Sequence, residues 1–327
     1  MQQRKLGADG PLVGAIALGC MSFAGAYGGT DESESHRTLA RALELGVDHL
    51  DTSNIYGEGR AEEVIGSFIK GRSHRFRIAT KAGIKRGPPR SFDNSPDYLR
   101  ECLEGSLSRL GVEHVDLFYI HRRDQRIPIE DVVGTLVRFK EEGKIGAIGF
   151  SEISPASLER ATTVHPVAAV QSEYSLWTRL PELGLVQACG RLGAALVAFS
   201  PLARGMFADE MPDPAQFDEK DFRRGNPRFA APNFSYNRER INHFVAYARG
   251  KGHAPSSLAL AWLLARAPHV IPIPGTRSPG HLEQDAAAAD IALTAKDVQE
   301  IEAILPVGFA HGARYSDQQN IGPEGYC

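Results

Sequence analysis

The feature that most constrains the fold is a regular alternation of short apolar runs with amphipathic helical stretches. Eight runs are each followed by such a stretch, and they cover residues 15–19, 47–51, 76–81, 115–121, 145–151, 167–175, 195–201 and 270–275. Nearly continuous apolar runs of this length are typical of parallel strands that are buried on both faces. The pattern therefore predicts an α/β fold, a closed (β/α)8 TIM barrel, and residues 1–327 are expected to form it as a single domain.

A doubly wound open sheet is the rival fold. It requires a G-x-G-x-x-G turn after the first strand, and residues 17–29, "ALGCMSFAGAYGG", do not have that spacing. Serine–proline pairs at 95–96 and 154–155 predict the starts of two helices. Helix ends are predicted at three glycines, Gly46, Gly111 and Gly193.

Two segments fall outside the repeat. Residues 203–237 form a polar, proline-rich insertion after the seventh strand, and a loop of this length is typical of a lid or a binding loop. The tail, residues 306–327, is the second segment. It either covers a pocket or forms a loosely packed terminus. Its candidates for covering a pocket are Phe309, His311, Arg314 and Tyr315.

Composition narrows the range of partners. A hydrophobic fraction of 42% with 24% charged residues is that of an ordinary globular protein, and a net charge of -3 favours neither nucleic acid nor an anionic membrane as a partner. The sequence shows neither a secretion signal nor an apolar run of membrane length, so a cytoplasmic protein is expected. The cysteines are scattered without a C-x-x-C motif, which favours reduced thiols over disulfides or zinc. They are Cys20, Cys102, Cys189 and Cys327.

Polar side chains stand at the ends of consecutive apolar runs, where the active site of a barrel lies. They are Asp51, Lys81, His121, Ser151 and Ser200, while the sixth run passes through Gln171, and Tyr56 follows Asp51 by five residues. Taken singly, Asp51 could cap a turn, Lys81 could lie on the surface and His121 could be a hydrogen-bonded core residue. Because these residues end neighbouring strands, they can also converge on one point.

Convergence would give the tyrosine a chemical role. A lysine ammonium beside a phenol favours the phenolate, and a buried aspartate keeps that lysine charged and oriented. Tyr56 could then give or take a proton near neutral pH, and His121 could orient a carbonyl oxygen or share the transfer. The residues therefore predict a catalytic group of Asp51, Tyr56, Lys81 and His121.

At this point the chain resembles the aldo-keto reductase superfamily over nearly its whole length. The resemblance rests on ordered blocks that include "LDTSNIYGEGRAEEVIG", "VDLFYIHRRD", "VAAVQSEYSLW", "FSPLARGMF" and "IPIPGTRSPGHLEQD", and on the branch motifs "GFSE" at 149–152 and "GARY" at 312–315. It implies an NAD(P)H-dependent, reversible reduction of aldehydes or ketones to alcohols. In this reaction Tyr56 is the general acid in reduction and the base in oxidation.

The resemblance also implies a cofactor site without a glycine-rich fingerprint. Ser151 and Gln171 would hold the carboxamide, Phe199 would stack on the nicotinamide, residues 200–205 would line the pyrophosphate and residues 275–277 would meet the 2'-phosphate. The full implied set is Gly19, Met21, Ser151, Glu152, Gln171, Phe199, Ser200, Pro201, Leu202, Arg204, Gly205, Ile273, Gly275, Thr276, Arg277, His281, Gln284 and Asp285. A guanidinium suits a phosphate physically, although Arg204 and Arg277 could also be solvated surface residues.

Four positions depart from the pattern of many relatives. Glu152 replaces an asparagine, His281 replaces a second 2'-phosphate arginine, and Gln284–Asp285 replaces a Glu-Asn pair near the adenine. A neutral histidine contributes no charge, so NADPH is the expected cofactor and NADH stays possible.

Two other functions stay open. Lys81 could be the Schiff-base lysine of a barrel aldolase, and the barrel could be a redox-sensing regulatory subunit with little turnover. A metal-dependent hydrolase is not indicated, because the strand ends carry no H-x-H motif or cluster of metal ligands. The expected partner is a small carbonyl or alcohol substrate. Phe23, Tyr27 and Trp177 either form an apolar wall of the substrate site or are ordinary packing residues. The sequence does not define the natural substrate, the direction of reaction or the oligomeric state.

Overall fold

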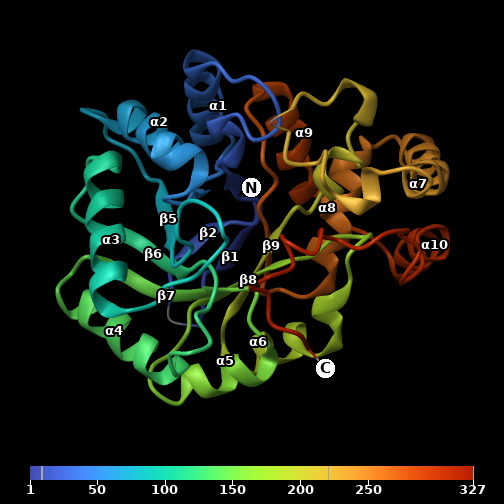
Figure 1. Cartoon of the computed structure of the whole chain (residues 1–327). Coiled ribbons are helices and arrows are strands. Elements are labelled where there is room, and N and C mark those ends of the chain that lie inside the picture. The colour runs from blue at the N-terminus through green and yellow to red at the C-terminus, as the bar shows by residue number, and fades with distance from the viewer. Residues whose placement is uncertain (9, 220, 327) are drawn as a thin grey trace.

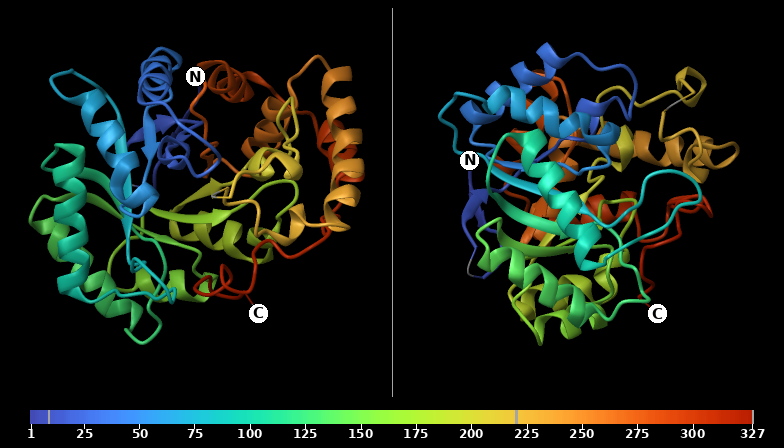
Figure 2. Two further views of the ribbon diagram at one scale, coloured as in Figure 1. Left: turned by 45° about the horizontal axis from the view of Figure 1, so that its top comes forward. Right: turned by 60° about the vertical axis from the view of Figure 1, so that its left-hand side comes forward.

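The computed structural model describes residues 1–8, 10–219 and 221–326. Within them, eight parallel strands pair in the order of the sequence, and helices surround them (Figures 1 and 2). The strands are β3 (Leu18–Gly19), β4 (His49–Asp51), β5 (Arg77–Ala82), β6 (Val115–Ile120), β7 (Ile145–Ser151), β8 (Ala169–Glu173), β9 (Ala195–Phe199) and β10 (Val270–Pro272). They coincide with the eight apolar runs.

Backbone hydrogen bonds join the first and last strands of this sheet. The amide of Ala17 donates to the carbonyl of Pro272 at 3.1 Å, and the amide of Gly19 donates to Pro274 at 2.9 Å. The sheet therefore curls until β3 lies beside β10. This arrangement confirms the predicted (β/α)8 fold.

A hairpin of β1 (Gln3–Lys5) and β2 (Leu12–Gly14) precedes the barrel. Leu6 and Val13 from this hairpin join a buried cluster with inward-facing residues of the strands, such as Leu117. A second and larger apolar cluster lies between the strands and the outer helices. The inner cluster fills the barrel, so the barrel is a packed core whose ligand site must lie at one mouth.

The helices cover the outside of the barrel. They are α1 (Glu32–Leu45), α2 (Arg60–Ile69), α3 (Pro96–Leu110), α4 (Ile129–Glu141), α5 (Pro155–Thr162), α6 (Leu185–Leu192), α7 (Asn233–Gly250), α8 (Pro255–Arg266), α9 (Pro279–Ala287) and α10 (Ala295–Ile304). The three predicted glycine ends are confirmed, because Gly46, Gly111 and Gly193 all adopt the left-handed conformation after a helix. Ser154 caps α5 by accepting from the amide of Ser157, whereas the Ser95 side chain makes no capping bond to α3.

The insertion after β9 is shorter than predicted. Its irregular part ends at residue 232, since α7 begins at Asn233 and takes up the last five residues of the predicted loop, 233–237. The polar letters "NFSYN" read as a loop, but Asn237 is buried and donates from its amide to the carbonyls of Arg228 and His311. Tertiary hydrogen bonds therefore override the local composition here.

The carboxyl-terminal tail is anchored to the barrel near the ends of β7 and β8. The Glu324 carboxylate accepts from the Ser154 amide at 2.9 Å, and the Tyr326 hydroxyl lies 3.0 Å from that of Ser172. Tyr315 is buried. Tyr315 lines the cavity described below, as expected for a tail that covers a pocket, whereas Phe309, His311 and Arg314 are not among the described lining residues.

Two further expectations concern the described part of the chain. In it, none of the helices combines the length and the apolar character that crossing a membrane requires. The thiols of Cys20, Cys102 and Cys189 are free, and Cys327 lies outside the described residues.

Candidate active site

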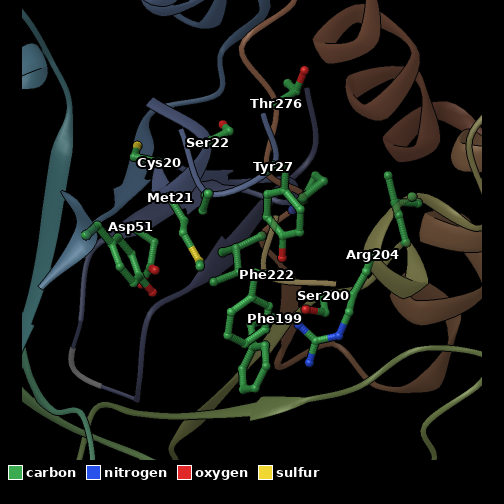
Figure 3. A pocket seen from close by; sticks show the side chains of 18 of the residues that line it. Cys20, Met21, Ser22, Tyr27, Asp51, Phe199, Ser200, Arg204, Phe222 and Thr276 are labelled. Carbon is green, nitrogen blue, oxygen red and sulfur yellow. The ribbon is translucent and has the colours of Figure 1, made fainter. Parts of the chain in front are cut away.

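A cavity of about 760 Å³ opens at the carboxyl ends of the strands. The predicted site residues that line it are Gly19, Met21, Asp51, Tyr56, His121, Ser151, Gln171, Phe199, Ser200, Pro201, Leu202, Arg204, Gly205, Ile273, Gly275, Thr276, Arg277, His281, Gln284 and Asp285. Figure 3 shows Asp51 and Arg204 on opposite sides of this view, with Thr276 toward the top. Segments far apart in the sequence therefore contribute to one cavity.

Lys81 lies beneath the wall of the cavity and joins two of the predicted residues. Its Nζ donates to Asp51 Oδ1 at 2.5 Å and to the Thr52 carbonyl at 2.6 Å, and it lies 3.4 Å from the Tyr56 hydroxyl. Side chains alternate along β5, so Thr80 faces outward to Glu62 while Lys81 faces the barrel interior. Asp51 and Lys81 are almost completely buried. The lysine thus bridges a carboxylate and a phenol.

The turn that carries Tyr56 requires glycine. Gly57 follows it with φ 57°, and a Cβ at this position would lie 2.7 Å from the Cβ of Ala24. A side chain at residue 57 would therefore push the loop away from its neighbour. The glycine keeps the phenol next to Lys81.

Burial dominates the acidity of the phenol. It raises the pKa of Tyr56 above its ordinary value, while the Lys81 ammonium acts in the opposite direction. The expectation that Lys81 brings this pKa down is therefore not met. The free energy that burial adds to the phenolate exceeds the stabilisation that Lys81 provides, because the Lys81 ammonium is also paired with Asp51.

The lysine itself stays charged. Burial opposes its ammonium form, but Asp51 and Tyr56 outweigh that effect and raise the pKa of Lys81. A charged Lys81 favours the phenolate once Tyr56 has given up its proton. The arrangement therefore keeps the proton on the phenol at neutral pH and stabilises the anion that forms after its transfer.

His121 stands beside the phenol. The two rings are 5.9 Å apart in an edge-to-face arrangement, and His121 Nδ1 lies 3.1 Å from Ser53 Oγ. Burial and the charges of Arg122, Lys81 and Arg90 hold the pKa of His121 well below its usual range. The imidazole is therefore neutral, and Nε2 is the nitrogen left for a ligand.

Three residues expected at the carboxamide make contacts with the protein. Gln171 Nε2 donates to Asp51 Oδ2 at 2.7 Å, and Ser151 Oγ accepts from Arg122 at 3.0 Å. Glu152 pairs with Arg314 and accepts from Ser172 and from the Glu173 amide. The structure therefore places the Glu152 carboxylate in a buried ionic cluster rather than among the described residues of the cavity wall.

The two arginines expected at phosphates differ in their surroundings. Arg204 is buried and pairs with Glu173 at 3.2 Å, so its charge is already balanced. Arg277 is half-buried, and its Nε lies 3.9 Å from Glu34 Oε2. Both arginines and Glu34 line the cavity, so neither arginine is simply a solvated surface residue. Arg277 is the more accessible to an added anion.

The far end of the cavity lies at the start of α9. His281 is exposed, Gln284 donates to Asp209 Oδ2 at 2.8 Å, and Asp285 is buried. Within the described residues, nothing donates a hydrogen bond to the Asp285 carboxylate, and burial raises the pKa of this group to about 8. A neutral acid at this place resembles an amide in its ability to donate and accept.

The insertion meets the loop after β3 across the cavity. The Phe222 amide donates to the Ala26 carbonyl at 3.2 Å, and the Arg223 guanidinium lies 5.2 Å from the centre of the Tyr27 ring. Tyr27 and Phe222 both line the cavity and appear in Figure 3. Phe23 and Trp177, expected beside Tyr27, are buried and absent from the described lining residues.

Several lining residues were missed by the sequence reasoning. Arg122 follows His121 directly, so its place at a strand end was a usable signal, whereas Arg90 and Ser256 lie on elements that carry no chemical motif. Ser22 and Ser256 each have a buried hydroxyl without a hydrogen-bond partner in the described structure. Unsatisfied hydroxyls that face a cavity fit a polar ligand such as a dinucleotide.

The chemistry available is proton transfer beside a long cavity. Its reacting end holds the phenol, the lysine and the neutral imidazole, and Phe199 offers an aromatic face nearby. In the described residues, no group of three or more His, Cys, Asp or Glu side chains is placed to hold a metal ion. Fold and cavity together describe a barrel whose mouth carries a phenol, a charged lysine and a neutral imidazole beside a cavity whose wall includes polar groups.

Comparison with known proteins identifies the family. The model of the Aldo/keto reductase family matches residues 15–306. The chain is 38% identical over 324 residues to probable aldo-keto reductase 1 of Glycine max, covering 96% of this chain and 92% of that protein. It is 39% identical over 320 residues to aldo-keto reductase yakc [NADP(+)] of Schizosaccharomyces pombe, covering 95% and 94%.

Solved structures agree. The glycerol dehydrogenase AKR11B4 from Gluconobacter oxydans matches with a TM-score of 0.83 at 28% identity, covering 93% of this chain and 94% of that one. The holo form of aldo-keto reductase AKR11C1 from Bacillus halodurans matches with a TM-score of 0.76 at 25% identity, covering 98% and 99%. The chain therefore belongs to the aldo/keto reductase family of oxidoreductases, which use nicotinamide cofactors.

Proposed function

We propose that the protein is an NADPH-dependent reductase that converts aldehydes or ketones to alcohols, and that the reaction is reversible. The observation that carries this proposal is the position of Lys81 Nζ, 2.5 Å from Asp51 and 3.4 Å from the Tyr56 hydroxyl at the cavity wall. A phenol supported in this way can act as a general acid. Family membership supplies the reaction class.

The reduced nicotinamide, when bound, supplies the hydride. Tyr56 gives its proton to the carbonyl oxygen of the substrate, and Lys81 stabilises the phenolate that this transfer leaves. Asp51 keeps the lysine charged and in place. His121 contacts the same carbonyl oxygen through Nε2, because Nδ1 already faces Ser53. In the oxidative direction the phenolate takes the proton back.

The cofactor is proposed to lie along the cavity from Phe199 to α9. Ser151 and Gln171 would hold the carboxamide and Phe199 would stack on the ring. Residues 200–205 would contact the pyrophosphate and Arg277 the 2'-phosphate. The S. pombe relative carries NADP(+) in its name, which favours the phosphorylated cofactor, and NADH stays possible because Glu34 partly offsets Arg277.

The aldolase alternative is less well supported. A Schiff-base lysine needs a depressed pKa and access to the substrate. Lys81 has a raised pKa, is fully buried, and lies behind Tyr56 with bonds to Asp51 and Thr52. Borohydride trapping in the presence of carbonyl substrates should therefore give no covalent adduct at Lys81.

A screen of cofactor consumption tests the proposal. The purified protein is mixed with NADPH and with a series of aldehydes and ketones. The decrease in the absorbance of the reduced nicotinamide is then followed over many turnovers. We expect sustained, substrate-dependent oxidation of NADPH. Tight binding of NADPH with less than one turnover across the series would instead support the redox-sensing regulatory subunit.

A further inference from the structure

Two arginines that line the cavity, Arg90 and Arg122, form no ion pair with a carboxylate of the described residues, although the Arg122 charge reaches the buried Glu152 carboxylate and lowers its pKa. Arg122 is buried and donates from Nη1 to the His121 carbonyl at 2.6 Å and to Ser151 at 3.0 Å, but its Nε has no partner. Arg90 is half-buried on the loop between β5 and α3, and its Nε is likewise buried without a partner. In the described part of the chain, no carboxylate lies within ion-pair distance of either guanidinium.

The other cavity arginines are different. Arg204 pairs with Glu173 at 3.2 Å, Arg223 pairs with Asp221 at 2.6 Å, and Arg277 lies 3.9 Å from Glu34. Each of these three guanidinium groups has a carboxylate beside it that balances its charge. These arginines therefore do not by themselves indicate an anionic ligand. Arg90 differs from them most clearly, and Arg122 has only the Glu152 carboxylate, which lies beyond ion-pair distance.

Both arginines line the same cavity as Tyr56 and His121, and Arg122 donates to the His121 carbonyl. Burial, followed by the charge of Arg122, lowers the pKa of Arg90. Both guanidinium groups also help to lower the pKa of His121. Two like charges held together in a partly buried place are unfavourable, and an anion between them would relieve the repulsion and meet their unused N–H groups.

We infer that Arg90 and Arg122 form an anion subsite for the substrate, and that the enzyme reduces carbonyl compounds carrying a carboxylate. This inference rests on the proposed reductase function. A planar guanidinium matches a carboxylate in shape and charge. The subsite adjoins His121, so a substrate held there by its carboxylate can present its carbonyl group to Tyr56 and His121.

The two arginines have separate roles. Arg122 is a positioning residue as well as a charge, because it holds the His121 backbone and the Ser151 hydroxyl. Arg90 makes no hydrogen bond to another described residue, and its guanidinium lies 5.7 Å from the centre of the Phe92 ring. Arg90 is therefore the residue whose replacement tests recognition of the anion with the least disturbance of the catalytic group.

A matched pair of substrates tests the inference. We compare kcat/KM for 4-carboxybenzaldehyde and 4-formylbenzamide, which have nearly the same shape and differ by one negative charge. Arg90→Gln should lower the ratio of the two values by about tenfold, in line with the loss of one charge-assisted contact. The two aldehydes also differ in intrinsic reactivity, but this difference cancels when the kcat/KM ratio of the variant is divided by the kcat/KM ratio of the wild type.

Lys85→Gln is the control. It removes one positive charge from the same loop, but Lys85 is half-exposed and is not one of the described cavity residues. Its substrate ratio should stay within about twofold of the wild type, because screened surface charges contribute little. Equal ratios in wild type and Arg90→Gln, or equal loss in both variants, would overturn the subsite.

Calorimetry separates this inference from the proposed function. Benzoate and benzamide are titrated into the wild type and Arg90→Gln, with and without NADP+. Benzoate should bind the wild type about tenfold more tightly than benzamide, and Arg90→Gln should abolish the difference. Equal binding of the two ligands to the wild type would contradict the subsite even if aldehydes are reduced. Preferential binding of benzoate without any turnover would contradict the reductase and retain the subsite.

Discussion

The two ends of the cavity are built in different ways. At the reacting end, Asp51 and Lys81 are buried and bonded to each other, and Lys81 supports Tyr56 from below. At the far end, Arg277 is half-buried with one distant ion pair and His281 is exposed. One end is fixed by strands and buried contacts, while the other lies on a loop and the first turn of a helix.

This difference suggests that one end of the cavity acts on the reaction and that the other end acts on cofactor binding. A buried, bonded group costs nothing to arrange when a ligand arrives, so it can act on the reaction itself. A half-buried cation such as Arg277 contributes mainly to the binding of a charged ligand. We therefore expect substitutions of Asp51, Lys81 or Tyr56 to change turnover, and those at the far end to change the affinity and choice of cofactor.

The largest effect is expected for Tyr56→Phe. The change removes only the hydroxyl that lies 3.4 Å from Lys81 Nζ. Turnover of an aldehyde should fall by about two to four orders of magnitude, as for the loss of a general acid. The dissociation constant for NADPH, measured by fluorescence titration, should change little. Turnover close to that of the wild type would show that the proton comes from another group.

The next effect concerns Lys81 and Asp51, which are proposed to act on the same proton. Lys81→Met and Asp51→Asn should each reduce turnover strongly. The double variant should lose much less than the product of the two single losses, because either change already breaks the 2.5 Å contact. A double-mutant cycle on kcat measures the coupling. Fully additive barriers would mean that the two residues work independently.

At the far end, Arg277→Ala should weaken NADPH. The dissociation constant should rise by about ten- to a hundredfold, because a charge-assisted contact to the 2'-phosphate is lost, while that for NADH should hardly change. Glu34→Gln is the matched opposite, since it removes the carboxylate 3.9 Å from Arg277 and should tighten NADPH by a few-fold. Equal weakening of both cofactors in Arg277→Ala would place the phosphate elsewhere.

Asp285 should have the smallest effect on catalysis and a distinct effect on stability. Burial raises its folded pKa to about 8, whereas an unfolded aspartate titrates near about 3.9. Between these values the folded state holds one more proton than the unfolded state, so this group makes stability fall as pH rises. Below the unfolded pKa the effect is absent.

The isosteric variant Asp285→Asn should remove this dependence of the free energy of unfolding on pH. Its free energy of unfolding should exceed that of the wild type by about 4 kcal/mol at pH 7, and the difference should shrink toward zero near about pH 3.5. Urea unfolding at several pH values provides the measurement. A difference that does not vary with pH would show that Asp285 is already ionised in the folded protein.

The fold could be predicted from the sequence because its signal is repeated. Each apolar run coincides with a parallel strand, and glycines end the helices as expected. The start of α7 at Asn233 could not be predicted from composition, because its polar residues are held by contacts with segments distant in the sequence, including the bond from Asn237 to His311.

The candidate site likewise has features that could be predicted from the sequence and features that could not. Residues at strand ends could be predicted, since the topology of a barrel brings them to one mouth. The upward direction of the Tyr56 pKa and the pairing of Glu152 with Arg314 could not, because both depend on burial and on the path of the tail. Arg90 lies on a loop between β5 and α3 with no motif, so only the folded chain shows that it lines the same cavity as His121.

Isotope transfer tests the central claim most directly. The protein is incubated with an aldehyde and NADPH that carries deuterium at the transferable position of C4, and the alcohol is analysed by mass spectrometry for wild type and Tyr56→Phe. We predict one deuterium on the carbinol carbon with the wild type, and a yield lower by about two to four orders of magnitude with Tyr56→Phe. Alcohol without deuterium, no alcohol from the wild type, or equal yields from both proteins would contradict the account.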